Sequence, residues 1–218
     1  MKKYLIDTAM TVTLFLSMIL VSCSKNKDNR NTNNNLNSQV NNLPNEPLNT
    51  DERATLPFMR EEEKLARDVY IFLYSKWALT IFNNISSSEQ SHMDAIAQLL
   101  NKYNLPDPVG SNVYGIFSNP VLQNLYTQLT TQGSVSLLDA LKVGATIEDL
   151  DIYDLKVALT KVDNQDITLV YNNLVKGSRN HLRSFYSNLL SAGGTYTPQY
   201  ITQAEFDAII NSPMETGN

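Results

Sequence analysis

The chain has 218 residues, of which 42% are hydrophobic and 18% are charged, and its formal net charge is −5. This acidic balance argues against a general nucleic-acid-binding protein, which needs a basic face to meet the phosphates. The single cysteine excludes a disulfide framework and a cysteine-based zinc site, and the two histidines exclude a three-histidine metal site. Any metal site in this chain must therefore be built mostly from carboxylates.

The first residues have the pattern of an export signal. Two lysines near the start precede an apolar run over residues 10–21, which is too short for a comfortable membrane span. Residues 20–23, Leu-Val-Ser-Cys, resemble the bacterial lipobox, in which the cysteine becomes the acylated first residue. We therefore expect residues 1–22 to be a lipoprotein signal peptide, and Cys23 to anchor an exported protein to membrane lipid in a bacterial cell envelope. An ordinary secreted protein and an uncleaved anchor are the alternatives.

Residues 23–50 have the composition of a tether. The segment is dominated by asparagine, contains no aromatic residue and has only isolated leucines and valines. Such a segment cannot bury enough apolar area to offset the entropy lost on ordering. The sequence therefore predicts a disordered linker over 23–50 and a folded domain over 51–218.

The folded part has a helical apolar period and no strand-like alternation. Pro57 and the glutamates that follow it are typical of a first helical turn, which predicts a helix over 57–77. Asn119 and Pro120 are a suitable cap and first-turn pair for a short helix that ends at about residue 132. The other expected helices are 81–103, 134 to 159 or 162, 163 or 164 to 190, and a final turn within 196–210.

Four of these helices are long, and one connection between them is long as well. Four substantial helices in one domain favour an antiparallel bundle. The long connection, residues 104–133, lies between the second and third long helices. A bundle with one long crossover is the ferritin-type arrangement. The expected fold is therefore all-α, a ferritin-like antiparallel four-helix bundle.

Candidate metal ligands occur on all four long helices. Glu89 and His92 are three residues apart, so both side chains can reach one ion from one helix face. In di-iron carboxylate bundles, two helices each supply such a Glu-x-x-His pair and the other two each supply a glutamate. The remaining candidates are Glu63, Glu148, Asp151 and His181. This ligand set suits iron in a mononuclear or dinuclear site, and by ligand type also manganese or zinc.

These motifs resemble those of known proteins. Glu63-x-x-Ala66-Arg67-x-x-Tyr70 is similar to the first-helix motif of rubrerythrins and other ferritin-like proteins, and Glu89-x-x-His92 is similar to their second-helix motif. A closer resemblance is to a ferritin-like family catalogued only as a domain of unknown function, and it spans nearly all of residues 56–210. The segments that carry it are Glu61 to Asp68, Ser88 to Met93, Ile147 to Asp151 and Gly177 to Leu182. The resemblance implies the bundle fold and a metal centre, but no activity.

The chain departs from the di-iron pattern at one position. The second Glu-x-x-His pair would place a glutamate three residues before His181, but Ser178 occupies that position. Asp151 could replace the missing carboxylate, because it lies one turn from Glu148 on the same face. Otherwise the site holds one metal, holds two weakly, or is vestigial.

Several neighbouring side chains have alternative interpretations. Arg67 and Ser178 are candidates for orienting the ligands, although a surface ion pair would equally explain Arg67. Tyr70 lies two turns after Glu63 and could reach a metal-bound oxidant, but a buried tyrosine with a hydrogen-bonded hydroxyl is the simpler interpretation. The glutamates at 61 and 62 are expected to be solvated first-turn charges rather than ligands.

Two functions of different classes follow. The first is a membrane-anchored metal-binding bundle with redox chemistry on peroxide or oxygen. The second is a non-catalytic surface lipoprotein that uses the bundle for partner binding or envelope structure, with the same polar residues as a buried hydrogen-bonded network. Nucleic acid is not an expected partner, and the sequence leaves the protein partner, the oligomeric state and enzymatic activity open.

Overall fold

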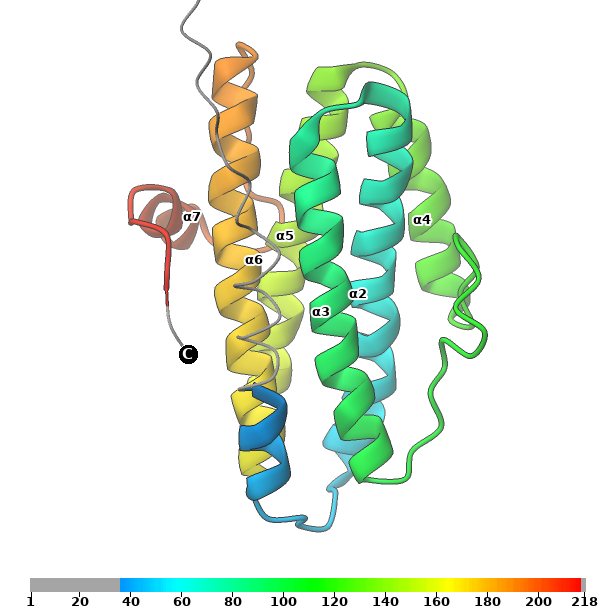
Figure 1. Ribbon diagram of the computed structural model, residues 1–218. Coiled ribbons are helices and arrows are strands. Elements are labelled where there is room, and N and C mark those ends of the chain that lie inside the picture. The colour runs from blue at the N-terminus through cyan, green and yellow to red at the C-terminus, as the bar shows by residue number, and fades with distance from the viewer. Residues whose placement is uncertain (1–35, 217–218) are drawn as a thin grey trace, which may run out of the picture.

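The computed structural model describes residues 36–216, and these form an all-helical protein (Figure 1). No residue in this range belongs to a strand, so the predicted all-α class is confirmed. None of the helices within 36–216 is long and apolar enough to cross a bilayer. The predicted signal peptide and Cys23 lie outside the described residues.

The first long helix begins earlier than the sequence predicted. Helix α2 spans Thr50–Trp77, and Pro57 lies inside it rather than in its first turn. The helix starts with a capping box, in which Asn49 accepts a hydrogen bond from the backbone N–H of Glu52 and Glu52 accepts one from Asn49. Glu52 also accepts from the N–H groups of Asp163 and Asn164, so the start of α2 is tied to the connection before helix α6 (Gln165–Ser191). This capping box, and not Pro57, sets the start of the helix.

The other helices lie close to their predicted positions. They are α3 (Thr80–Lys102), α4 (Pro120–Gly133), α5 (Leu137–Leu159), α6 (Gln165–Ser191) and α7 (Gln203–Ile210). Asn119 caps α4 as expected, through the N–H of Val121. Helix α5 begins after the predicted start at residue 134, because it is capped by Ser136, whose hydroxyl accepts from the N–H of Asp139.

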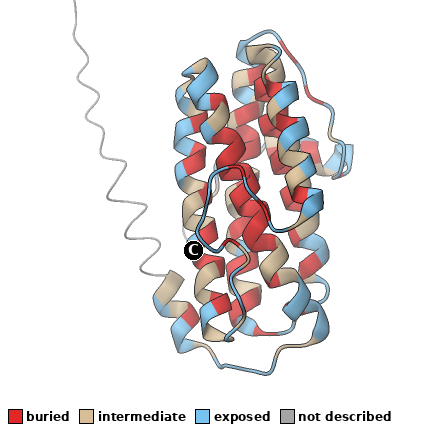
Figure 2. Ribbon diagram, turned by 90° about the vertical axis from the view of Figure 1, so that its right-hand side faces the viewer, coloured by how far each residue is buried: buried red, intermediate tan, exposed pale blue. Residues whose placement is uncertain are grey.

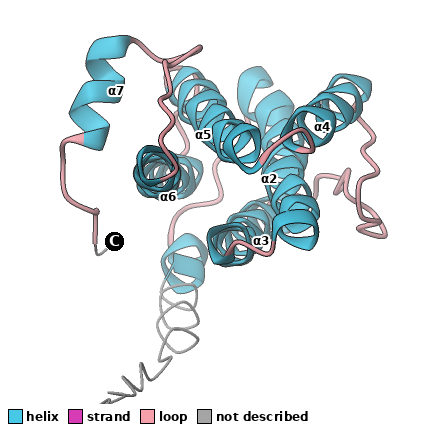
Figure 3. Ribbon diagram, turned by 90° about the horizontal axis from the view of Figure 1, so that it is seen from above, coloured by secondary structure: helices cyan, strands magenta, loops and turns pink. Residues whose placement is uncertain are grey.

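The long helices lie side by side in two pairs. Helix α2 packs along α3 and α5 packs along α6, and the two pairs meet where α2 contacts α5 and α3 contacts α6. Helices α2 and α6 run in one direction and α3 and α5 in the other (Figure 1). Seen from above, these four helices enclose a common interior, with α4 outside α2 and α5 and α7 beside α6 (Figure 3).

The apolar core is divided into two clusters along the helix axes. One contains Tyr70, Phe82 and Phe185, and the other contains Leu99 and Tyr171. Buried residues line the interior along the length of the molecule (Figure 2). On α2, α3 and α6 the candidate ligands fall between residues of the two clusters, and on α5 they lie at the end of the first cluster, next to Ile152. The packing of both ends therefore positions a polar layer in the middle of the core.

The described part of the predicted tether is ordered against the helices. Residues 36–42 are helical, and Val40 is fully buried. Lys102 donates to the backbone carbonyls of Val40, Leu43 and Pro44 and forms an ion pair with Asp166. The prediction of disorder over 23–50 is thus wrong for residues 36–50. The prediction rested on the average composition of residues 23–50, which does not report the few apolar residues and backbone carbonyls that make these contacts.

The connection between α3 and α4 is fastened by buried charges on α2. Lys64 and Asp68 are both fully buried and lie 2.5 Å apart (Nζ to Oδ2). Lys64 also donates to the carbonyl of Val113, and Asp68 accepts from the N–H of Gly115. Burial of a charge is tolerated only when it is paired and hydrogen-bonded, as it is here. We call the connection between α3 and α4, residues 103–119, the crossing segment. These contacts hold the crossing segment against α2, outside the interior that contains the candidate ligands.

Candidate metal centre

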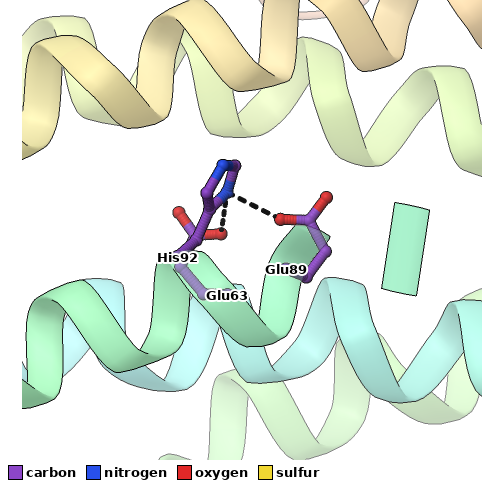
Figure 4. A group of neighbouring side chains, drawn as sticks. All are labelled: Glu63, Glu89 and His92. Atoms are coloured by element: carbon purple, nitrogen blue, oxygen red, sulfur yellow. Dashed lines mark hydrogen bonds and ion pairs between the residues drawn. The ribbon is translucent and has the colours of Figure 1, made fainter. Parts of the chain in front are cut away.

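The candidate ligands of α2 and α3 converge on one histidine. In Figure 4 the carboxylates of Glu63 and Glu89 both point toward the ring of His92. His92 Nδ1 lies 3.0 Å from Glu63 Oε2 and 2.8 Å from Glu89 Oε2. The i, i+3 spacing of Glu89 and His92 places both on one face of α3, and α2 supplies Glu63 from the neighbouring helix. This first triad, Glu63–Glu89–His92, has the mutual distances of a metal site.

A second triad is assembled on the other side of Glu89. His181 Nδ1, on α6, lies 2.8 Å from Glu89 Oε1 and 3.3 Å from Glu148 Oε2. Glu148 comes from α5, so three helices meet here. The second triad, Glu89–Glu148–His181, also has the distances of a metal site.

Glu89 is shared by the two triads, with one carboxylate oxygen directed to each. The two imidazole rings are nearly parallel, at an interplanar angle of 27°, and their centroids are 5.5 Å apart. A carboxylate that presents one oxygen to each of two adjacent donor groups is the arrangement that bridges two cations in carboxylate bundles. The geometry brings together five of the six predicted ligands: Glu63, Glu89, His92, Glu148 and His181.

Asp151, the sixth predicted ligand, lies beside the triads but belongs to neither. Its carboxylate is hydrogen-bonded to the hydroxyl of Ser178, which also lies 2.9 Å from the carbonyl of Leu174. The other oxygen, Asp151 Oδ1, is buried without a hydrogen-bond partner. The position that would hold a glutamate in a di-iron bundle thus holds a serine that contacts Asp151, and the carboxylate comes from α5.

Polar and steric contacts orient the ligands from behind. The hydroxyl of Tyr70 donates to Glu148 Oε1, which confirms the hydrogen-bonded interpretation of this tyrosine. His181 Nε2 lies 3.0 Å from the hydroxyl of Ser88, leaving Nδ1 to face the carboxylates. The ring of His92 packs on Gly177, where a Cβ atom would lie 2.5 Å from Nε2. Contacts of this kind set the ring orientation and tautomer of metal-binding histidines.

The charges at this centre do not balance without protons or cations. The side chains of Glu63, Glu89, Glu148 and Asp151 are all buried, and the ion pairs of residues 36–216 connect them to no lysine or arginine. Burial acts to lower the pKa of His181, but Glu89 and Glu148 outweigh it and raise that pKa to about 10. Burial raises the pKa of Asp151 to about 7, against the lowering effect of its bond with Ser178.

The same balance acts on the other ligands. Burial and the nearby Asp151 carboxylate raise the pKa of Glu63. Burial also raises the pKa of Glu148. Burial alone would raise the pKa of Glu89, but the two imidazoles hold it below its usual range. Without a cation, these shifts favour the protonated forms of Glu63 and Glu148 and the ionised form of Glu89 between the two rings.

Several buried ligand atoms lack a hydrogen-bond partner. Glu63 Oε1 has none. Glu89 Oε1 and His181 Nδ1 are only 2.8 Å apart but are not aligned as a hydrogen bond. Buried polar atoms are normally satisfied, and unpartnered ligand atoms are what a site that takes up an ion would present. Two divalent cations would balance the four carboxylates and supply partners to these atoms, so the residues fit a carboxylate-bound metal pair.

Three of the predictions for neighbouring residues need correction. Arg67 hydrogen-bonds to Asp68, Gln90 and Asn112, so it holds the crossing segment and α3 and does not orient the ligands. Glu61 is buried and accepts from the N–H groups of Ser118 and Asn119 at the start of α4. Glu62 is also buried, and neither of its oxygens has a hydrogen-bond partner. Neither glutamate is a solvated first-turn charge, because the helix begins well before them.

Two contributors to the site were not identified from the sequence. Ser88 precedes Glu89 and supports His181 from another helix, and Gly177 makes room for the ring of His92. Both lie inside the motifs that carried the family resemblance. No signal in the sequence alone assigned them a role, because each acts across a helix interface.

Comparison with known proteins places the chain in a family. Residues 52–213 match the family model described as an uncharacterized protein domain, DUF2202. The chain is 56% identical over 178 residues to the uncharacterized protein MJ0754 of Methanocaldococcus jannaschii, an alignment that covers 82% of this chain and 96% of the relative. A crystal structure of the hypothetical protein MJ0754 from Methanococcus jannaschii superimposes on this chain with a TM-score of 0.78 and 57% sequence identity. The superposition covers 79% of this chain and 99% of the crystallised chain. The chain belongs to the DUF2202 family.

These comparisons correct the predicted location. The sequence predicted a lipid-anchored protein of a bacterial cell envelope, but the relative with 56% identity is archaeal. The bacterial lipid-anchored location is therefore not supported. Two lysines, a short apolar run and a lipobox-like cysteine motif together form a permissive pattern, and the predicted location rested on that pattern.

Proposed function

We propose that the protein is a ferritin-like four-helix bundle that binds a pair of divalent metal ions in its interior. The arrangement of α2 with α3 and of α5 with α6, the long connection that carries α4, and the running directions of the helices support this topology. The single observation that carries the metal proposal is Glu89, whose two oxygens each face a separate triad. Iron is the first choice, with manganese and zinc as alternatives of suitable ligand type.

The residues of such a site would have different roles: some would bind the ions, and others would position the ligands. Glu63 with His92 and Glu148 with His181 would each hold one ion, and Glu89 would bridge them. Tyr70 and Ser88 fix the positions of Glu148 and His181, and the two apolar clusters exclude bulk water from either end. A bound pair of redox-active ions would supply the electrons needed to reduce oxygen or a peroxide. The centre has three carboxylates and two histidines, with Asp151 alongside. This set of side chains supports metal binding more directly than it supports the reduction of oxygen or peroxide.

The test of this proposal is metal content. We expect the full chain, freed of metal and then titrated with Fe²⁺ without oxygen, to bind about two ions per chain, the number that two triads with a bridging carboxylate can hold. Elemental analysis after gel filtration measures this number. Admitting oxygen to the loaded protein, and following iron oxidation by near-ultraviolet absorption, tests the redox part separately. A folded protein that retains no metal would contradict the proposal and favour a purely structural polar network.

The apparent metal affinity should depend on pH. The imidazoles must lose their protons to act as ligands, and the pKa of His181 is raised to about 10 in the metal-free protein. Burial also raises the pKa of Glu63, so any proton that it holds must likewise leave. Binding therefore releases protons, and the apparent affinity should rise by about tenfold per pH unit for each proton released. Titration with Co²⁺ between about pH 6 and pH 8 measures this slope. An affinity independent of pH would show that the histidines are not ligands.

A further inference from the structure

Glu62 is a buried carboxylate that the metal centre does not use. Its exposed fraction is 4%, both of its oxygens lack a hydrogen-bond partner, and the ion pairs within residues 36–216 do not include it. A buried, ionised and unpaired carboxylate is very costly, and a glutamine or an apolar side chain would avoid that cost. The position therefore calls for an explanation beyond the stability of the fold.

The groups that face Glu62 are also acidic. Asp151 and Asp154 of α5 act on it electrostatically, and the Asp154 carboxyl group is within hydrogen-bond range. Two ionised carboxylates cannot donate to each other, so this close pair needs either a proton or a cation between its members. The structure thus holds, next to the centre, a second group of acids that must share a proton or a cation.

These acids are ordered from the surface to the centre. Asp154 is half-buried, and Asp151 lies one turn before it on the same face of α5 with an exposed fraction of 6%. Asp151 Oδ1 is unpartnered, and its carboxylate is close enough to raise the pKa of Glu63, a ligand of the first triad. Asp154 therefore lies nearest the surface, and the buried Glu62 and Asp151 lie between it and the metal centre.

We propose that Asp154, Glu62 and Asp151 form a route along which divalent cations pass between the surface and the metal centre, between α2 and α5. The proposal rests on the metal-binding function above and adds how the ions reach it. Each acid offers free oxygen lone pairs, so an ion can exchange its water ligands for carboxylate oxygens in steps. A passage lined by one sign of charge raises the local concentration of the counter-ion and can raise its association rate by about 10- to 1,000-fold.

The experiment measures loading rate and final occupancy separately. The metal-free full chain is mixed with Co²⁺ alone in a stopped-flow instrument, and the visible absorption of bound Co²⁺ is followed to its plateau. We expect Glu62→Gln and Asp154→Asn to slow loading by about tenfold, since each removes one charge from the route. The plateau should be unchanged, because neither residue belongs to a triad. Asp207→Asn, at an exposed position of α7, is the control with the same change in net charge.

The possible outcomes separate the proposed route from the proposed metal centre. Loading at the wild-type rate in both variants would overturn the route and leave the metal centre intact. A lower plateau for Glu62→Gln would make Glu62 a ligand and also overturn the route. A wild-type protein that takes up no Co²⁺ would contradict both the route and the proposed function. Should Glu62→Gln fail to fold by circular dichroism, the half-buried Asp154→Asn still decides the question.

Discussion

Replacing Glu89 by glutamine is expected to remove most of the bound metal from both triads at once. Glu89 is the residue that the triads share, and each of its oxygens lies 2.8 Å from a different imidazole nitrogen. Glutamine keeps the shape of the side chain but has one oxygen and no charge, so it cannot bridge two cations. Iron per chain, measured by elemental analysis after anaerobic loading, should fall from about two to well below one.

The substitution should also destabilise the metal-free protein. The pKa of Glu89 is held below its usual range by two imidazoles whose own pKa values are raised, so the ionised carboxylate lies between two positive charges. Removing one partner from a buried ion pair costs about 3–5 kcal/mol when the other charge stays unpaired. The imidazoles can release protons here, which places the expected loss at the lower end, about 3 kcal/mol in urea unfolding.

Glu61→Gln is the matched control for this change. Glu61 is also a buried glutamate, but its oxygens face the N–H groups of Ser118 and Asn119 rather than the centre. Its substitution should weaken the cap of α4 and leave the metal content near the wild-type value. Equal metal loss in both variants would mean that a general loss of stability, and not a missing bridge, is being measured.

Replacing Gly177 by alanine is expected to weaken metal binding although Gly177 carries no ligand atom. A Cβ atom at this position would lie 2.5 Å from Nε2 and 2.6 Å from Cε1 of His92, so the ring must move. Overpacking of this kind costs about 1–3 kcal/mol of stability. Disturbing the contacts that orient a ligand typically lowers metal affinity by about 10- to 100-fold. Competition with a Co²⁺ chelator measures the change in affinity.

Gly133→Ala separates the effect on the ligand from the effect on packing. A Cβ atom at residue 133 would lie 2.6 Å from Leu73 Cδ2, a comparable clash within the apolar core. This variant should lose stability and keep its affinity for Co²⁺. Unchanged affinity in Gly177→Ala would show that His92 is not held as a ligand by its contact with residue 177.

The ligands that were predictable are those with a local pattern. The Glu-x-x-His spacing at Glu89 and His92 reports helix geometry directly, and the remaining acids and the second histidine followed from the placement of four long helices. The structure brings five of these six side chains into two triads. The helical periods were long and clear, so most helix ends were located to within a few residues.

The residues that were misjudged depend on where α2 begins. Placing its first turn at Pro57 made Glu61 and Glu62 resemble favourable charges at a helix N-terminus. The helix begins at Thr50, so both lie in its middle, where the dipole offers no such stabilisation. Asn49, the cap that sets this start, lies in the segment interpreted as a tether. The error in the start of α2 therefore accompanied two others: residues 36–50 were predicted to be disordered, and Glu61 and Glu62 were predicted to be solvated.

The division of the core into two apolar clusters has a consequence for how the molecule unfolds. Each cluster has its own set of packed side chains, and the layer between them holds carboxylates and imidazoles. In the absence of cations that layer contributes mutual repulsion as well as attraction, so it joins the two ends weakly. Ions held by all four helices would couple the two ends, so that heat disrupts them together and not one before the other.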